Sequence, residues 1–149
     1  MSITMSQIKD LRASSGAGMM DVKKALEVTD GDMKKAVEWL RKKGLERAEN
    51  KSDRATGVSR VFSYVHFNGL VGAMVQLSCE TDFVAKTDDM GKLGQELAMQ
   101  VASMNPENVE EFLKQDYLKD SKKTIEKLVK EVSGKTGENV VVSKIVRLG

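Results

Sequence analysis

The sequence is poor in the residues from which catalytic and metal centres are usually built. Its 149 residues include one cysteine, Cys79, and one histidine, His66. A single cysteine excludes an internal disulfide, which fits a reducing cytoplasm, and the two residues together cannot form a typical zinc site. A Cys79/His66 nucleophile pair would lack a third, orienting group. The sequence also lacks a Walker-type loop and a GxGxxG fingerprint. We therefore expect a binding protein without a cofactor, not an enzyme.

Long apolar runs and an excess of one charge are absent as well. No stretch is apolar enough to span a membrane, and the first twelve residues resemble neither a signal peptide nor an organelle presequence. The net charge of +2 argues against nucleic acid as the main partner. With 31% charged and 40% hydrophobic residues, the composition is that of a soluble globular protein. We expect a cytoplasmic protein with no membrane partner.

The N-terminal part, residues 1–45, predicts three short helices. Thr4 and Gln7 form a capping box for the first helix, and Ser15-Gly16-Ala17-Gly18 ends it. Met19 or Met20 opens the second helix, and the third carries apolar residues at helical spacing from Met33 onwards. Gly44 is a candidate end cap for the third helix. Such a module resembles a ubiquitin-associated domain, a fold that usually binds other proteins.

Met19 and Met20 are unusual because two adjacent helical residues cannot both face one core. At least one of them is expected to point outward, beside Arg12 and Lys23. Flexible methionine side chains suit adaptable protein contacts. The alternative is that one methionine packs inward and the other is an exposed residue without a function, and spacing alone does not separate the two.

A charged segment, residues 46–56, predicts a linker that is helical at its start, and residues 57–149 predict a core domain. From Gly57 the apolar residues recur every second position, as in strands. Asn68-Gly69 lies between two such stretches and indicates a hairpin, because both positions tolerate a positive φ. In the second strand the apolar positions run from Val71 to Cys79, which predicts one buried face.

The hairpin leads into Cys79-Glu80-Thr81-Asp82-Phe83-Val84-Ala85-Lys86. Thr81 suits a helix cap and Asp82 suits a first turn, so Phe83 is expected at a strand-to-helix corner. A phenylalanine there can project outward as a probe for another protein, or it can fold back into the core. Spacing alone favours the core, since most phenylalanines are buried.

The remainder predicts helices followed by a last strand. A helix opens at Asp88 or Asp89 and ends before Asn105-Pro106, and a weak helical turn follows. Ser121 is expected to cap a further helix that ends at Gly137. Apolar residues on the even positions of 140–148 then indicate a third strand, interrupted by Lys144. The predicted fold class is α+β, with an antiparallel three-stranded sheet packed against helices.

Two motifs resemble the elongation factor Ts family, whose members exchange nucleotide on elongation factor Tu. CETDFVAK (residues 79–86) and GAGMMDVKKAL (residues 16–26) occur in the family's order and at about its spacing. The ending KTGENVVVSKIVRL (residues 135–148) is similar to the family's close. Because the chain looks short after Met104, it resembles a reduced form with a single core.

The resemblance implies a binding surface for elongation factor Tu in its GDP-bound and nucleotide-free states. In the TDFV motif, Asp82 and Phe83 would press into the GTPase domain near its magnesium and nucleotide site. The N-terminal module would contact that domain elsewhere. A serine-tyrosine-x-histidine hairpin would reach the third domain of elongation factor Tu. Because the chain has a single core, this third-domain contact implies a second copy of the chain, and therefore a homodimer. The implied partner-binding residues are Thr81, Asp82, Phe83, Val84, Arg12, Met19, Met20, Lys23, His66 and Gly137.

Two other functions compete with nucleotide exchange. The N-terminal module could capture ubiquitin-like or nascent chains, although such a module needs neither the hairpin nor TDFVAK. The sequence pI of about 8.6 could indicate an RNA binder, but the basic residues are interleaved with acidic ones, as on a solvated face.

Overall fold

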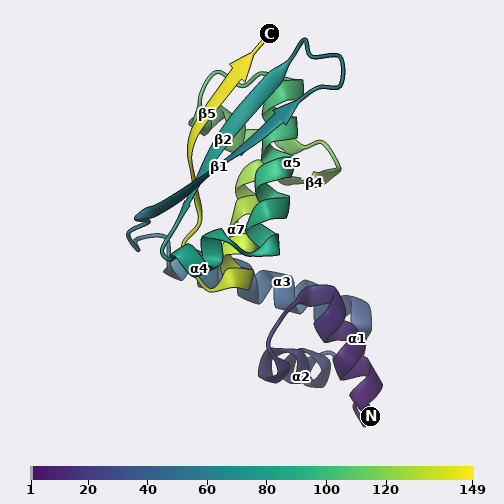
Figure 1. The fold of residues 1–149 in the computed structure, drawn as a ribbon. Coiled ribbons are helices and arrows are strands. Elements are labelled where there is room, and N and C mark those ends of the chain that lie inside the picture. The colour runs from purple at the N-terminus through teal and green to yellow at the C-terminus, as the bar shows by residue number, and fades with distance from the viewer. Residues whose placement is uncertain (1) are drawn as a thin grey trace.

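A computed structural model gives the structure of residues 2–149, which combines three N-terminal helices with an α+β core (Figure 1). The predicted fold class is confirmed. No helix in this described range is long and apolar enough to cross a membrane. The elements are α1 (Met5–Ser15), α2 (Met19–Val28), α3 (Met33–Asn50), β1 (Val58–Val65), β2 (Gly72–Cys79), α4 (Asp82–Ala85), α5 (Asp88–Met104), α6 (Val109–Lys114), β3 (Asp116–Tyr117), β4 (Asp120–Thr124), α7 (Ile125–Thr136) and β5 (Val141–Leu148).

The N-terminal helices enclose a small core of their own. The predicted capping box between Thr4 and Gln7 is present at the start of α1. Arg47 of α3 donates two hydrogen bonds to Asp21 of α2, at 2.7 and 2.8 Å, and this partner lowers the pKa of the Asp21 carboxyl. The buried apolar side chains between the helices are Ile8, Leu11, Val22, Ala25, Leu26, Ala36 and Leu40.

Helix α3 continues through Gly44 to Asn50, so the expected end cap at Gly44 was wrong. The backbone at Gly44 instead packs closely against α7. A Cβ atom added at Gly134 of α7 would lie 2.2 Å from the Gly44 carbonyl oxygen, so the two helices approach this closely because residue 134 lacks a side chain. Arg41 and Glu131 pair beside this crossing at 3.4 Å. The crossing fixes α3 directly against the core.

The sheet has the order β1-β2-β5 and is antiparallel throughout. Helix α5 packs along its inner face, and a Cβ atom added at Gly94 of α5 would lie within 2.4 Å of the Phe62 ring. The hairpin is present, but of the Asn68-Gly69 pair only Gly69 has a positive φ (+72°). The outer face of the sheet is open, and its exposed apolar side chains are Val61, Val65, Met74, Val146 and Leu148.

Two further expectations were wrong. Ser121 lies within β4, and Thr124 caps α7 by accepting a hydrogen bond from the Lys127 amide. In β5 the even positions do not share one face, because the register shifts beside Ser143. After this bulge the inward side passes to the odd positions: Ile145 packs against the core and Arg147 donates to the Ala102 carbonyl of α5 at 3.0 Å.

Candidate functional site

The TDFV motif forms a sharp corner between the hairpin and the helices. Strand β2 ends at the buried Cys79. Thr81 then has extended backbone angles and caps the single-turn helix α4, its side chain accepting a hydrogen bond from the Val84 amide at 3.3 Å. Val84 and Ala85 are buried beneath the corner. The predicted strand-to-helix corner is therefore present.

Phe83 projects from this corner into solvent and is 82% exposed. The preference for a core position, drawn from spacing alone, was wrong, because Val84 and Ala85 take the inward positions of the short helix. Asp82 is exposed beside it and pairs with Lys86 at 2.7 Å. Such a surface pair adds little stability, so the Asp82 carboxylate can exchange this contact for one with a partner.

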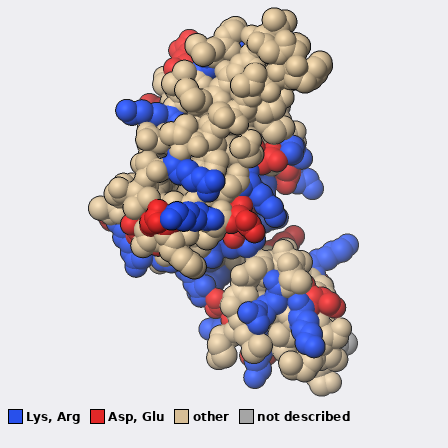
Figure 2. Space-filling model, viewed as in Figure 1, with Lys and Arg blue, Asp and Glu red and all other residues tan. Residues whose placement is uncertain are grey.

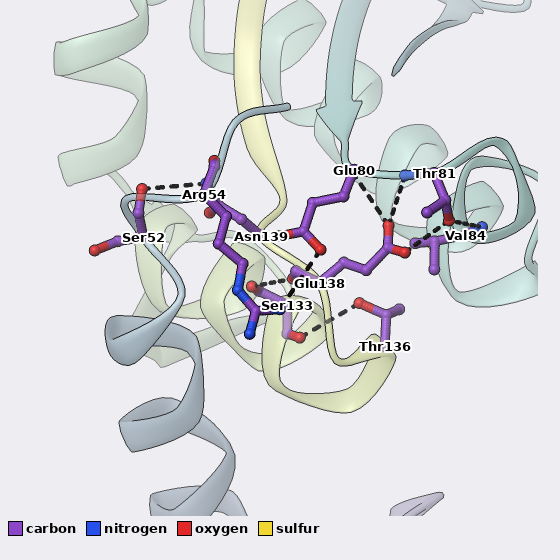
Figure 3. Close-up of polar contacts among 9 residues, drawn as sticks. All are labelled: Ser52, Arg54, Glu80, Thr81, Val84, Ser133, Thr136, Glu138 and Asn139. Carbon is purple, nitrogen blue, oxygen red and sulfur yellow. Dashed lines mark hydrogen bonds and ion pairs between the residues drawn. The ribbon is translucent and has the colours of Figure 1, made fainter. Parts of the chain in front are cut away.

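Glu138 holds the corner from the far end of the chain (Figure 3). Its carboxylate accepts hydrogen bonds from the Glu80 amide at 3.1 Å, the Thr81 amide at 2.9 Å and the Thr81 hydroxyl at 2.6 Å. Hydrogen bonds to an ionised acceptor are stronger than neutral ones. The backbone entering α4 is thus fixed by one side chain.

Two more side chains support the corner from below. Arg60 of β1 donates from Nη1 to the Ala85 carbonyl at 2.9 Å, and the Cys79 thiol donates to the Thr81 carbonyl at 3.2 Å. Burial, with the nearby Glu138 carboxylate, raises the pKa of the Cys79 thiol. The thiol therefore keeps its proton and remains a donor.

The segment around Glu138 also contacts the chain that follows α3. Gly137 ends α7 in the left-handed region (φ +79°), as predicted, and adjoins the corner through Glu138. Asn139 donates from Nδ2 to the carbonyls of Ser52 and Arg54, at 3.2 and 2.8 Å, as Figure 3 shows. The corner and the stretch that leads from the N-terminal helices therefore meet at one segment.

The N-terminal residues implied in binding lie on a separate surface. Met19 is 50% exposed and Met20 is 79% exposed, so the prediction that at least one points outward is confirmed. Lys23 is exposed on the same helix, α2, and Arg12 is exposed on α1. In Figure 1, α3 lies between α2 and the corner at α4. The structure thus presents two distinct candidate contact regions.

His66 lies at the other end of the hairpin from the corner. Its Nδ1 atom is 2.8 Å from the Tyr64 hydroxyl. The eight residues of β1 separate the two ends, a distance of about 23 Å at the usual rise per residue. The structure therefore groups Thr81, Asp82, Phe83, Val84 and Gly137, and it leaves His66 apart.

Sequence reasoning missed Glu138 and Arg60. Both act on residues that are distant in sequence, and neither belongs to a local pattern that signals this contact. The one available signal for Glu138 was its place in the GEN segment, directly after the predicted helix end.

Comparisons with known proteins agree with the motifs. A family model described as "Elongation factor TS" matches residues 80–149. Elongation factor Ts of Oleidesulfovibrio alaskensis is 37% identical over 190 residues, covering 97% of this chain and 96% of that protein. The Thermotoga maritima protein of the same name is 39% identical, with 99% and 96% covered. That of Trichlorobacter lovleyi is 44% identical over 146 residues, with 98% of this chain and 47% of that protein covered.

The first two alignments are longer than this chain, so those relatives contain segments that it lacks. This agrees with the expectation of a shortened core. The similarity nevertheless extends over nearly the whole of both proteins. On these grounds the chain belongs to the elongation factor Ts family.

Proposed function

We propose that this chain releases GDP from elongation factor Tu by protein–protein binding, with no catalytic constellation of its own. Family membership supports a role in translation elongation. The observation that carries the proposal is Phe83, a large apolar side chain that is 82% exposed on a corner anchored by long-range hydrogen bonds. A rigid support and a free aromatic side chain are what an inserted residue requires.

In this mechanism Phe83 acts as a wedge and Asp82 as its polar anchor. Insertion near the magnesium and nucleotide site of the partner would separate elements that hold the ion. Magnesium requires near-ideal octahedral geometry, so small shifts weaken its binding. By linkage, a factor that favours the nucleotide-free partner binds the GDP-loaded partner more weakly by the same free energy. About 1.4 kcal/mol of such coupling changes nucleotide affinity tenfold.

The N-terminal surface supplies a second contact in this proposal. Met19 and Met20 form an exposed apolar pair on α2, with Lys23 exposed on the same helix and Arg12 exposed on α1. Figure 2 shows Lys and Arg side chains gathered on the N-terminal helices. This surface would hold the GTPase domain while the corner enters it, and the α3–α7 crossing at Gly44 and Gly134 fixes the spacing between the two.

The first test is release of labelled GDP from elongation factor Tu, with the wild-type protein and with Phe83→Ala. We expect acceleration by the wild type and a loss of most of it in the variant. Acceleration that survives in Phe83→Ala would reject the wedge and keep the exchange function. No acceleration by the wild type would reject the exchange function itself.

We also propose that a second copy of the chain covers the open face of the sheet. Soluble monomers seldom expose a contiguous apolar patch of this kind, and Figure 2 shows few charged side chains over the upper part of the molecule, where the hairpin turn and the C-terminus lie. Met74 lies opposite Ser63 on one neighbouring strand and Val146 on the other, at the centre of that face. Light scattering after size exclusion should give a dimer, and Met74→Lys should give a monomer; a monomeric wild type would contradict this.

A further inference from the structure

We propose that Glu138 is the positioning residue of the Phe83 corner. The inference deepens the proposed exchange function and rests on it for its kinetic consequence, although the geometry stands by itself. The Glu138 carboxylate is the shared acceptor for the backbone amides of Glu80 and Thr81 and for the Thr81 hydroxyl. It reaches them across 57 and 58 residues of chain.

Phe83 cannot set its own direction, because its side chain is largely free of protein contacts. Its orientation depends on α4, a helix of four residues. A single helical turn is unstable by itself, since it orders several residues for very few hydrogen bonds. The corner therefore requires an external anchor, and the structure provides one at its entrance.

Thr81 transmits the anchor to the helix. Its hydroxyl donates to Glu138 Oε2 at 2.6 Å and accepts from the Val84 amide at 3.3 Å. The first bond fixes the side-chain rotamer that the second one needs. Loss of the Glu138 carboxylate would therefore release two backbone amides and would also free the rotamer of the Thr81 cap.

Glu138 is itself held in place by its neighbours. Its carbonyl accepts a hydrogen bond from the Ser133 hydroxyl at 2.5 Å, and Gly137 before it adopts the left-handed conformation that ends α7. Asn139 after it is bonded to the Ser52 and Arg54 carbonyls. The Glu138 carboxylate thus holds the corner in a fixed position relative to α7 and to the segment after α3.

The kinetic test compares Glu138→Ala and Glu138→Gln with the wild type in GDP release from elongation factor Tu. We expect the maximal rate to fall about tenfold in Glu138→Ala, as for the loss of charged hydrogen bonds, with the half-saturating concentration little changed. Glu138→Gln keeps an acceptor for the amides, so its maximal rate should lie between those of Glu138→Ala and the wild type. Glu110→Ala, which removes an exposed carboxylate that pairs only with Lys114 in the described structure, is the control and should match the wild type.

A second measurement needs no partner. Amide hydrogen exchange at Glu80 and Thr81 should accelerate in Glu138→Ala, while amides in the centre of the sheet stay protected. If Glu138→Ala does not fold, Thr81→Val removes both bonds of the hydroxyl, the one to Glu138 and the one from the Val84 amide, and Thr81→Ser restores them. In this pair a maximal rate of Thr81→Val equal to that of the wild type would overturn the role of Thr81 in transmitting the anchor.

The outcomes separate the two proposals. A normal rate in Glu138→Ala, with Phe83→Ala defective, would overturn the role of Glu138 and keep the wedge. A normal rate in Phe83→Ala would overturn the wedge, and the amide measurement would still decide whether Glu138 holds the corner. Unchanged protection of the Glu80 and Thr81 amides in Glu138→Ala would overturn the inference directly.

Discussion

The hairpin carries an exposed phenylalanine beyond each of its ends, and the two are supported in different ways. Phe67 is 93% exposed in the turn between β1 and β2, and Phe83 is 82% exposed on the corner after β2. The hydrogen bonds at the turn join close neighbours, such as the His66 amide to the Val71 carbonyl and the Gly69 amide to the His66 carbonyl. At the corner, the acceptor Glu138 comes from more than fifty residues away.

Exposure alone does not identify a side chain that can be inserted into a partner. Scattered exposed apolar residues are normal on protein surfaces, so Phe67 and Phe83 would rank alike by exposed area. They differ in anchoring, because a locally bonded turn can open without disturbing the core, whereas the corner is joined to β1, α7 and the segment after α3. Only Phe83 has the rigid support that a wedge needs.

The largest expected difference between the two ends is in thiol labelling. Cys79 is buried at the corner end, and burial raises the pKa of its thiol, so both access and thiolate fraction are low at pH 8. In Phe67→Cys the new thiol should react at least about a hundredfold faster than Cys79, because the turn is exposed and Cys79 reacts only after opening. Because the pKa of Cys79 is raised, its labelling rate should continue to increase at pH values above the ordinary pKa of a thiol. Similar rates for the two thiols would show that the corner is as open as the turn.

The next difference lies in the exchange reaction. Phe83→Ala should lower the maximal rate of GDP release by about 30-fold, as for a buried aromatic hot spot worth 2 kcal/mol. Phe67→Ala should leave the maximal rate unchanged, since Phe67 lies in the turn at the end of the hairpin away from the corner. Any defect in Phe67→Ala should therefore appear in the half-saturating concentration. A drop in maximal rate for both variants would remove the distinction between the two ends.

Much of the fold could be predicted because its signals are local. The capping box at Thr4, the cap at Thr81 and the end of α7 at Gly137 each depend on residues within one helical turn. The hairpin followed from the alternation around Asn68-Gly69. In each case the residues that carry the pattern are also the residues that form the contacts.

The features that were predicted wrongly or missed depend instead on residues that are distant in the sequence. Gly44 lies inside α3 and packs against Gly134, some ninety positions later, and the face reversal in β5 depends on its pairing with β2. Phe83 was assigned to the core by spacing because the sequence does not show that Val84 and Ala85 already fill the inward positions. Glu138 could not be found because its three hydrogen-bond donors lie in another part of the chain.

The smallest expected effect concerns Arg60, the second anchor of the corner. Its guanidinium lies 4.8 Å from the centre of the Phe62 ring and donates to the Ala85 carbonyl. Arg60→Met keeps an apolar chain over the ring and removes the hydrogen bond, which should lower the maximal exchange rate and the folding equilibrium by about fivefold each, or about 1 kcal/mol. GDP release and urea unfolding measure the two quantities, with Lys114→Met as a surface control.

A comparison of the exchange rate of Arg60→Met with that of Glu138→Ala tests how the corner is held. Arg60 contacts the end of α4, after Phe83, whereas Glu138 contacts its beginning. If orientation is set where the chain enters the helix, Glu138→Ala must impair exchange more than Arg60→Met, even where both lose similar stability. Equal impairment would mean that stability of the corner, and not its direction, limits the reaction.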